Sequence, residues 1–290
     1  MAFSDSICVD KHWFKKYNSK EMEQLYSEYL HKHNVQNTSH NIFSPLKDFV
    51  VWLIKVRFVS YEEIGKLLFY ASENFKNKQE ITRLENLEFN ENILIHFGDL
   101  TVENTTILNH FECIFVTGKL TFLDALFIND AYVNCGVLEV KNNLLISNHC
   151  CVMTREKTNN WDMTVISKIG ISLTDLAMIT GSISTEFLSM SGNTICTGKY
   201  HKVSKINLSQ SSNLNCTDYV ESSSIQMNGD SRILGNLKGN LELVMSDDSY
   251  IRGDVESEQT VLNDSAFIMG KPTIKNLIID GESKLYIEQS

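Results

Sequence analysis

The chain has 290 residues, and a hydrophobic content of 42% excludes wholesale disorder. Its net charge of −10 is unevenly placed, because residues 1–80 hold 11 Lys/Arg and 10 Asp/Glu whereas residues 81–290 hold 15 and 26. A negative field repels nucleic acids and membrane surfaces and attracts basic partners. We therefore expect a protein partner and no nucleic acid or membrane, although the same acid would also keep a long β surface soluble.

The N-terminal stretch Met1 to Lys16 lacks an apolar core of signal-peptide length, and the longest apolar run, Phe49 to Ile54, is too short to cross a bilayer. The seven cysteines are odd in number and show no C-x-x-C spacing. This cysteine usage fits a reducing compartment better than a disulfide framework. We therefore expect a cytoplasmic protein.

Residues 1–80 predict a helical domain with three amphipathic helices. The first follows Asn18, the second opens at Ser44-Pro45 and runs to about Val56, and the third follows a capping box formed by Ser60 and Glu63. Apolar residues recur at helical spacing in the first and third segments: Met22, Leu25, Tyr26, Tyr29 and Leu30, then Tyr61, Ile64, Leu67, Leu68, Ala71 and Phe75. We expect these helices to pack on one another and to close one end of the following domain as a cap.

From residue 81 to 290 a short phrase recurs, in which an apolar residue is followed by two residues, a glycine, one residue and an aliphatic residue. The glycines of its clear copies are Gly98, Gly118, Gly136, Gly181, Gly198, Gly253 and Gly270, with blurred copies near Thr217 and Gly235. Steps of 17 to 20 residues between neighbouring copies are typical of a solenoid, in which each coil buries its apolar residues by stacking on the next.

A second apolar patch follows each of these glycines by eight to ten residues, often with apolar and polar residues alternating, as in Leu241 and Leu243. Ser, Asn and Asp then mark the corners that a coil needs. The glycines are expected to allow a positive φ or a close approach between coils. The predicted fold is mainly β: a parallel β-solenoid of about ten coils with an N-terminal α-helical cap.

One repeat is longer than the others, because Gly181 comes 27 residues after Thr154. The excess of roughly eight to ten residues predicts a loop that leaves the coil, and it carries an exposed tryptophan beside charges, which is the kind of residue that anchors an interface. A harmless insertion is the alternative. The residues that we expect to contact a partner are in this loop and at an acidic corner: Arg155, Glu156, Lys157, Trp161, Asp162, Asp247 and Asp248.

The phrases Tyr250-Ile251-Arg252-Gly253-Asp254-Val255 and Phe267-Ile268-Met269-Gly270 resemble the coils of bactofilins, which are bacterial cytoskeletal proteins. The resemblance covers the last hundred residues well and the earlier coils loosely. It implies a right-handed parallel β-helix and end-to-end polymerisation through terminal coils. The three predicted helices ahead of the coils depart from the bactofilin pattern.

No arrangement of residues indicates an enzyme. Steps of 17, 19 and 20 do not follow the hexapeptide coils of β-helical acyltransferases, and His201 has no evident partner. No acidic ladder suited to polysaccharide cleavage follows the glycines. His110 and His149 are expected two coils, or about 9 to 10 Å, apart, which one zinc ion cannot bridge without distortion. We expect no catalysis, no cofactor and no metal.

These observations favour a non-catalytic binding protein, most concretely a bacterial immunity protein that neutralises a secreted, basic toxin through the acidic solenoid and its loop. The alternative is a bactofilin-like scaffold that oligomerises or polymerises through its C-terminal coil. For that alternative the expected contact edge is Leu285, Tyr286 and Ile287, and a homodimer through this coil is one possible assembly.

Overall fold

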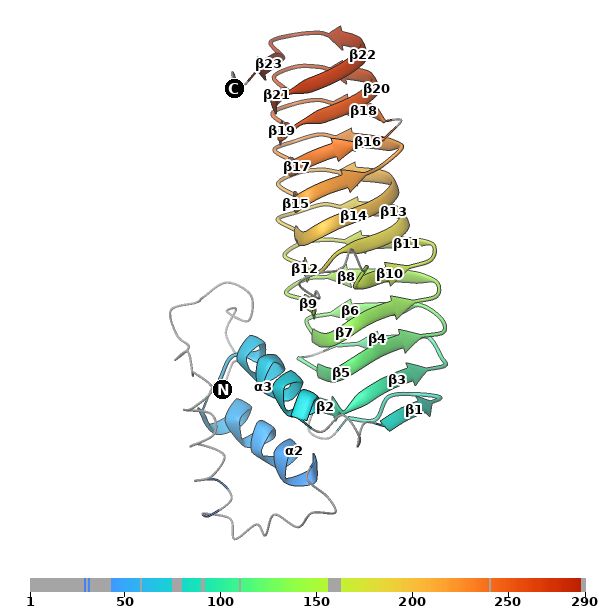
Figure 1. Ribbon diagram of the computed structural model, residues 1–290, viewed down its shortest axis with the longest axis vertical. Helices are drawn as coiled ribbons and strands as arrows, with labels where there is room; N and C mark the ends of the chain where they lie inside the picture. The colour runs from blue at the N-terminus through green and yellow to red at the C-terminus, as the bar shows by residue number, and fades with distance from the viewer. Residues whose placement is uncertain are drawn as a thin grey trace.

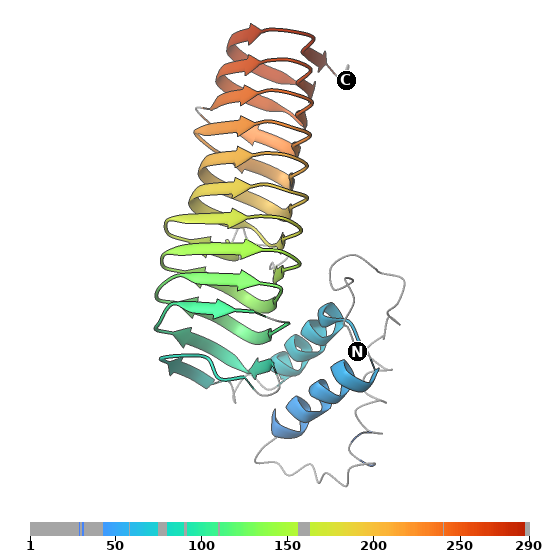
Figure 2. The same ribbon diagram turned by 180° about the vertical axis from the view of Figure 1, so that it is seen from behind.

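The computed structural model describes residues 29, 31, 43–57, 59–74, 80–89, 92–109, 111–155, 163–239 and 241–287. This part of the chain is mainly β: a single parallel sheet winds into a solenoid of about 11 turns, and two helices lie beside its first coils (Figure 1). The predicted fold class is therefore confirmed, with one coil more than expected. Viewed from behind, the coils stack in a single column from β1 to β23 (Figure 2).

The helical elements are α2 (Phe43–Trp52), a short π-helical turn η1 (Leu53–Arg57) and α3 (Tyr61–Asn74). The strands are β1 (Glu80–Leu84), β2 (Ile93–His96), β3 (Gly98–Val102), β4 (Thr106–Leu108), β5 (Cys113–Phe122), β6 (Leu126–Asn129), β7 (Tyr132–Val140), β8 (Asn143–Ser147), β9 (Cys151–Thr154), β10 (Val165–Ser167), β11 (Gly170–Leu173), β12 (Met178–Thr180), β13 (Ile183–Met190), β14 (Ile195–Leu208), β15 (Asn213–Glu221), β16 (Ser224–Met227), β17 (Arg232–Lys238), β18 (Glu242–Met245), β19 (Tyr250–Arg252), β20 (Val255–Leu262), β21 (Phe267–Gly270), β22 (Pro272–Ile279) and β23 (Lys284–Ile287).

Each full coil contributes strand residues to three faces, and every pairing between coils is parallel. The first face contains β2, β9, β12, β19, β21, β23 and the starts of β5, β7, β14, β15 and β17. The second face follows the recurring glycines and includes β1, β3 and β10. The third face includes β4, β6, β8, β11, β16 and β18.

The alternating pattern of each strand places one apolar column inside the coils. On the first face this column is fully buried from Ile114 to Ile268, and its members are Ile114, Val133, Val152, Ile179, Cys196, Leu214, Ile233, Ile251 and Ile268. These residues belong to one continuous core that extends from Leu100 to Ile268. Because no coil could bury its apolar side alone, stacking is the source of stability.

The recurring glycine serves both purposes that the sequence suggested. Gly253 has a φ of 151°, and a Cβ atom built there would overlap the carbonyl oxygen of Gly235 in the preceding coil. Gly270 repeats the arrangement one coil later, with a φ of 155° and an overlap on Gly253 O. A side chain at this corner would therefore force both an unfavourable φ and a wider coil spacing.

The register locates the predicted insertion. Cys135 pairs with Thr154 and Leu138 pairs with Val165, so residues 155–164 stand where the preceding coil has only Gly136 and Val137. The excess is thus eight residues, as expected from the glycine spacing. The coil itself closes normally, since β12 resumes the stack on β9.

Two of the three predicted helices are observed. Helix α2 with η1 covers the second prediction, and α3 begins after Ser60, whose Oγ accepts a hydrogen bond from the backbone N–H of Glu63 at 3.2 Å. The first predicted helix lies outside the described residues except for Tyr29, which is helical and buried. No helix in the described ranges is long and apolar enough to cross a membrane.

The sequence predicts that the helices close one end of the solenoid. Instead, they cover the first face of its early coils (Figures 1 and 2). Their apolar side forms a second core with residues that point outward from that face: Ile93, Ile95, Cys113, Phe115, Tyr132 and Cys151. The N-terminal end of the main core is instead packed by Leu84, Leu87, Phe89 and Leu94. The outward residues of the first face are apolar in these coils, so the helices bury them by packing on the side of the solenoid rather than on its end.

The glycine corner generates a stability prediction. Gly253→Ala should lower the free energy of unfolding by about 1 to 3 kcal/mol, because the new methyl group overlaps the neighbouring coil. Gly170→Ala is the matched control: no left-handed φ is required there, and the nearest atom to an added Cβ, Phe187 O, is 3.4 Å away. Urea unfolding followed by circular dichroism would measure both variants. Equal stability of the two would contradict the close-approach role of Gly253.

Candidate functional site

One corner of the solenoid, between the third and first faces, carries a left-handed residue in every coil. These residues all have φ between 50° and 82°: Asn92, Phe111, Asp130, Asn148, Asp175, Gly192, Gln210, Gly229, Asp247, Asp264 and Gly281. Seven of the eleven are Gly or Asp and two more are Asn, which are the types that adopt this conformation most readily. We call this column the turn corner.

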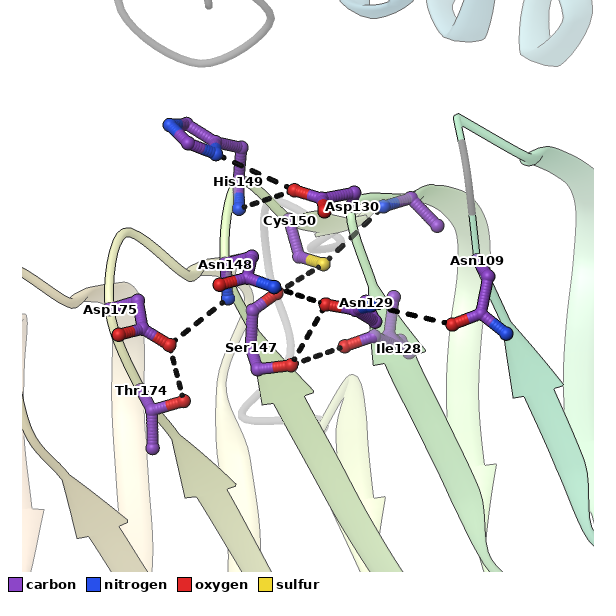
Figure 3. A network of polar contacts seen from close by, with 11 residues as sticks. Asn109, Ile128, Asn129, Asp130, Ser147, Asn148, His149, Cys150, Thr174 and Asp175 are labelled. Atoms are coloured by element: carbon purple, nitrogen blue, oxygen red, sulfur yellow. Dashed lines mark hydrogen bonds and ion pairs between the residues drawn. The ribbon is translucent and has the colours of Figure 1, made fainter.

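Side chains at the turn corner hydrogen-bond from coil to coil (Figure 3). The backbone N–H of Asn148 donates to Asp175 Oδ2 at 3.4 Å, and the Asn148 amide donates to Asn129 Oδ1. Ser147 Oγ donates to the same Asn129 oxygen at 3.3 Å. The polar corner residues thus replace, in part, the backbone hydrogen bonds that a strand would make.

Two potential metal ligands of the sequence are used locally in this network. His149 Nδ1 is 3.5 Å from Asp130 Oδ1, and Cys150 Sγ donates to the carbonyl oxygen of Ser147 at 2.8 Å (Figure 3). His110, the other residue considered for zinc, lies outside the described residues. Across the described ranges, no group of three or more His, Cys, Asp or Glu residues is placed to hold a metal ion.

The turn corner becomes strongly acidic over the last four coils. Six exposed carboxylates gather there, and none has an ion pair within the described part of the chain: Asp230, Asp247, Asp248, Asp264, Asp280 and Glu282. We call these six residues the acidic edge. Arg232 and Lys284 follow the corner in two of these coils, so the region remains net negative.

Only part of the acidic edge is available to a ligand. Asp247 Oδ2 accepts the backbone N–H of Gly229 at 2.9 Å, and Asp264 Oδ2 accepts that of Asp247 at 3.3 Å. Asp248 and its neighbours in the same column, Asp230 and Glu282, make no side-chain hydrogen bond among the described residues. The structure therefore separates the predicted pair: Asp247 supports the turn, and Asp248 faces solvent.

Of the predicted loop residues, only Arg155 lies in the described part of the chain. Its backbone N–H donates to the carbonyl oxygens of Cys135 and Gly136, and its guanidinium lies over the ring of Phe69 in α3, 5.2 Å from the centroid. Glu156, Lys157, Trp161 and Asp162 lie outside the described residues. Arg155 thus lies beside the helices, and Asp248 is on a different part of the molecule.

The residues of the predicted C-terminal contact edge also differ in where they point. Leu285 stacks on Ile268 in the inward column, whereas Tyr286 points outward beside Met269 and is 46% exposed. Ile287 pairs with Gly270 in the register, and its side chain is outside the described part. The exposed end of the core also includes three residues that sequence reasoning missed: Ile274, Leu277 and Ile279. Aligning β22 with the inward columns of earlier coils would have found them.

The buried side chains of His201 and of the cysteines have structural roles: His201 makes hydrogen bonds to the backbone, and the cysteine thiols are packed in the interior. His201 is fully buried in the second face, where Nδ1 accepts the backbone N–H of Ile183 at 3.2 Å and Nε2 lies 3.1 Å from the carbonyl oxygen of Asn215. Nε2 therefore carries the proton in this arrangement. Burial raises the pKa of the thiols of Cys150 and Cys216, each to about 11.

Comparison of the chain with protein-family models, with curated proteins and with solved structures found no match in any of the three. The candidate site is therefore described by its geometry alone: an acidic edge at a corner where coil-to-coil hydrogen bonds fix the backbone.

The buried thiols predict low reactivity. The six described cysteines are all buried thiols: Cys113, Cys135, Cys150, Cys151, Cys196 and Cys216. Burial raises the pKa of the Cys150 and Cys216 thiols to about 11, so only about one in a thousand of these two thiols is ionised at pH 8, and burial also blocks access to all six. A Cys8→Ser variant should thus show no fast-reacting thiol with a disulfide reagent until denaturant is added. Fast labelling of one or more thiols in the folded protein would contradict this prediction.

Proposed function

We propose that this chain is a non-catalytic, cytoplasmic protein-binding protein that neutralises a basic partner, most concretely as a bacterial immunity protein against a secreted toxin. The acidic edge carries this proposal. Six carboxylates in four consecutive coils, without ion pairs among the described residues, form a negative surface that a basic protein would complement.

Electrostatics favours such a complex. Neighbouring coils are about 4.8 Å apart, so carboxylates stacked at this spacing repel one another by about 1 kcal/mol per pair in water. A row of Lys or Arg side chains removes that repulsion and adds attraction. Because the Debye length is about 8 Å at physiological ionic strength, the attraction is strong at low salt and weak at high salt.

The rigid solenoid supports the same role. A recognition surface fixed by backbone pairing loses little conformational entropy when it binds, so more of the contact energy appears as affinity. The cytoplasmic location belongs to the proposal as well, and the reduced state of the six described cysteines supports it. The absence of catalysis is supported by the buried, hydrogen-bonded state of His201 and by the raised pKa of the Cys150 and Cys216 thiols.

The test is a complex with the product of the neighbouring gene in the native genome, measured by calorimetry at 50 and 500 mM NaCl. We expect tight binding that weakens as the salt concentration rises. In cells whose growth is inhibited by the partner, we expect expression of this protein to restore growth. The triple variant Asp230→Asn/Asp248→Asn/Glu282→Gln should raise the Kd about 10- to 100-fold, since each lost contact contributes about 0.5 to 1 kcal/mol.

The matched control removes the same number of charges elsewhere: Glu85→Gln/Glu88→Gln/Glu186→Gln. These residues are exposed and belong to coils that precede the acidic edge. If the control weakens binding as much as the triple variant, net charge rather than the acidic edge is responsible. If no complex forms at either salt concentration, the immunity role is wrong.

A second candidate is a bactofilin-like scaffold, and one observation favours it. In the last described coil, Leu277 and Ile279 point toward the core and Ile278 lies between them in the strand. All three remain exposed among the described residues: Leu277 by 40%, Ile278 by 52% and Ile279 by 48%. Another coil stacked on β22 would bury them and pair its free backbone groups. A second copy of the chain is the partner that this candidate requires.

Light scattering and electron microscopy of the purified protein would test the scaffold. We expect dimers or filaments that dissociate in Leu277→Asp/Ile279→Asp, because charges cannot be buried between stacked coils. The control Ile107→Asp/Val244→Asp changes two outward residues of the third face, 61% and 38% exposed, and should leave assembly intact. A monomer at all protein concentrations would rule the scaffold out.

A further inference from the structure

Among the described residues, helices cover the first face only over its early coils, and its last coils present an aromatic strip. Tyr250 and Phe267 stack with ring centroids 5.0 Å apart and planes 5° from parallel, and Tyr286 meets Phe267 edge-on at 5.8 Å. Arg232 lies over Tyr250, with Cζ 5.4 Å from the ring centroid. Met269, partly exposed beside them, completes the aromatic strip.

The aromatic strip occupies the same outward columns that the helices cover earlier. The register carries the position of Tyr132 through successive coils to Tyr250 and Phe267, and it carries the position of Phe115 to Met269 and Tyr286. In the early coils Tyr61 of α3 packs on both, 4.8 Å from Tyr132 and 6.1 Å from Phe115 between ring centroids. A helix on aromatic residues of this face is thus an arrangement that the molecule already contains.

Helix α3 also shows how a helix fits the first face. Tyr61 packs on Tyr132, a Cβ at Gly65 would overlap the Asn134 side chain, and Phe69 meets Arg155, which hydrogen-bonds to the carbonyl oxygens of Cys135 and Gly136. The eight helical steps from Tyr61 to Phe69 advance about 12 Å, and the four strand steps from 132 to 136 advance about 13 Å. The helix therefore runs along the strands, and it begins at the turn corner.

A helix placed in the same way on the last coils would begin at the acidic edge. Tyr250 follows Asp248 by two residues in the chain, so the carboxylates border the aromatic strip directly. The N-terminus of a helix carries a partial positive charge, which carboxylates stabilise. Lysine or arginine in the first turns of that helix would add to the attraction, while its apolar stripe would cover Tyr250, Phe267 and Tyr286.

We infer that the aromatic strip and the acidic edge together form the docking site for an amphipathic α-helix of the partner, lying along β19, β21 and β23 with a basic N-terminal end over the carboxylates. This inference rests on the proposed function, because it names the part of the partner that is bound. Two observations carry it: the continuity of the first face with the surface that α3 already covers, and the charge complementarity at the corner.

The experiment uses two designed helical peptides and the full chain. Both peptides carry the same stripe of Leu and Phe; one has three Lys residues in its first two turns, and the other has three Glu residues there. Fluorescence anisotropy at 50 mM NaCl should show at least 10-fold tighter binding of the Lys peptide. That preference should vanish at 500 mM NaCl and in Asp230→Asn/Asp248→Asn/Glu282→Gln.

The aromatic strip is tested separately. The variant Phe267→Ala/Tyr286→Ala should weaken the binding of the Lys peptide at least 10-fold. Circular dichroism would establish that this variant remains folded. If it unfolds, Leu234→Ser replaces it, since Leu234 is 36% exposed on the same face and should weaken binding about 3-fold. Phe127→Ala is the matched control: it is 38% exposed on the third face and should not change the affinity.

Equal affinity of the two peptides, or an effect of the control as large as that of the strip variant, would overturn the inference. The outcome is separable from that of the proposed function. If a natural complex forms but is insensitive to the strip variants, the docking site is wrong and the binding role stands. If the peptides bind as expected but no natural complex forms, the docking site stands and the immunity role fails.

Discussion

Close stacking of successive coils is the constraint on which the rest of this structure depends. Parallel pairing on three faces brings the backbones so close at the glycine corner that Gly253 and Gly270 leave no room for a Cβ atom. The same spacing aligns inward residues into a single core and outward residues into continuous columns. A substitution in one coil therefore alters the packing of the two coils that it contacts, as expected for a solenoid.

The columns give each face its own chemistry. On the first face the outward residues are apolar in the early coils, where α2 and α3 cover them. In the last coils the outward columns carry the aromatic residues Tyr250, Phe267 and Tyr286, with Arg252 and Lys284 in the same columns. At the turn corner the need for a positive φ selects Asn, Asp and Gly, and coil-to-coil hydrogen bonds use some of their side chains. Carboxylates that the turn does not use, such as Asp248, remain exposed to solvent.

Carboxylates that support the turn and carboxylates that face solvent thus lie side by side at one corner. Asp247 and Asp248 are adjacent in sequence, yet one accepts a backbone N–H from the neighbouring coil and the other faces solvent. The acidic edge is consequently held at fixed spacing by the same residues that close the turns. Such preorganised charge favours fast, salt-dependent association with a basic partner and suits the neutralising role that we propose.

The sequence by itself determined the solenoid, its coil length, the site of the eight-residue insertion and two helix starts, because periodic spacing and capping are local properties of the chain. It also placed Asp247 and Asp248 together at an acidic corner, without distinguishing their roles. Only the tertiary structure decided that the helices lie on the first face, that Tyr286 points outward while Leu285 points into the core, and that the aromatic strip borders the acidic edge. These outcomes depend on the register between coils, which brings together residues 17 to 20 positions apart and cannot be read from any one segment.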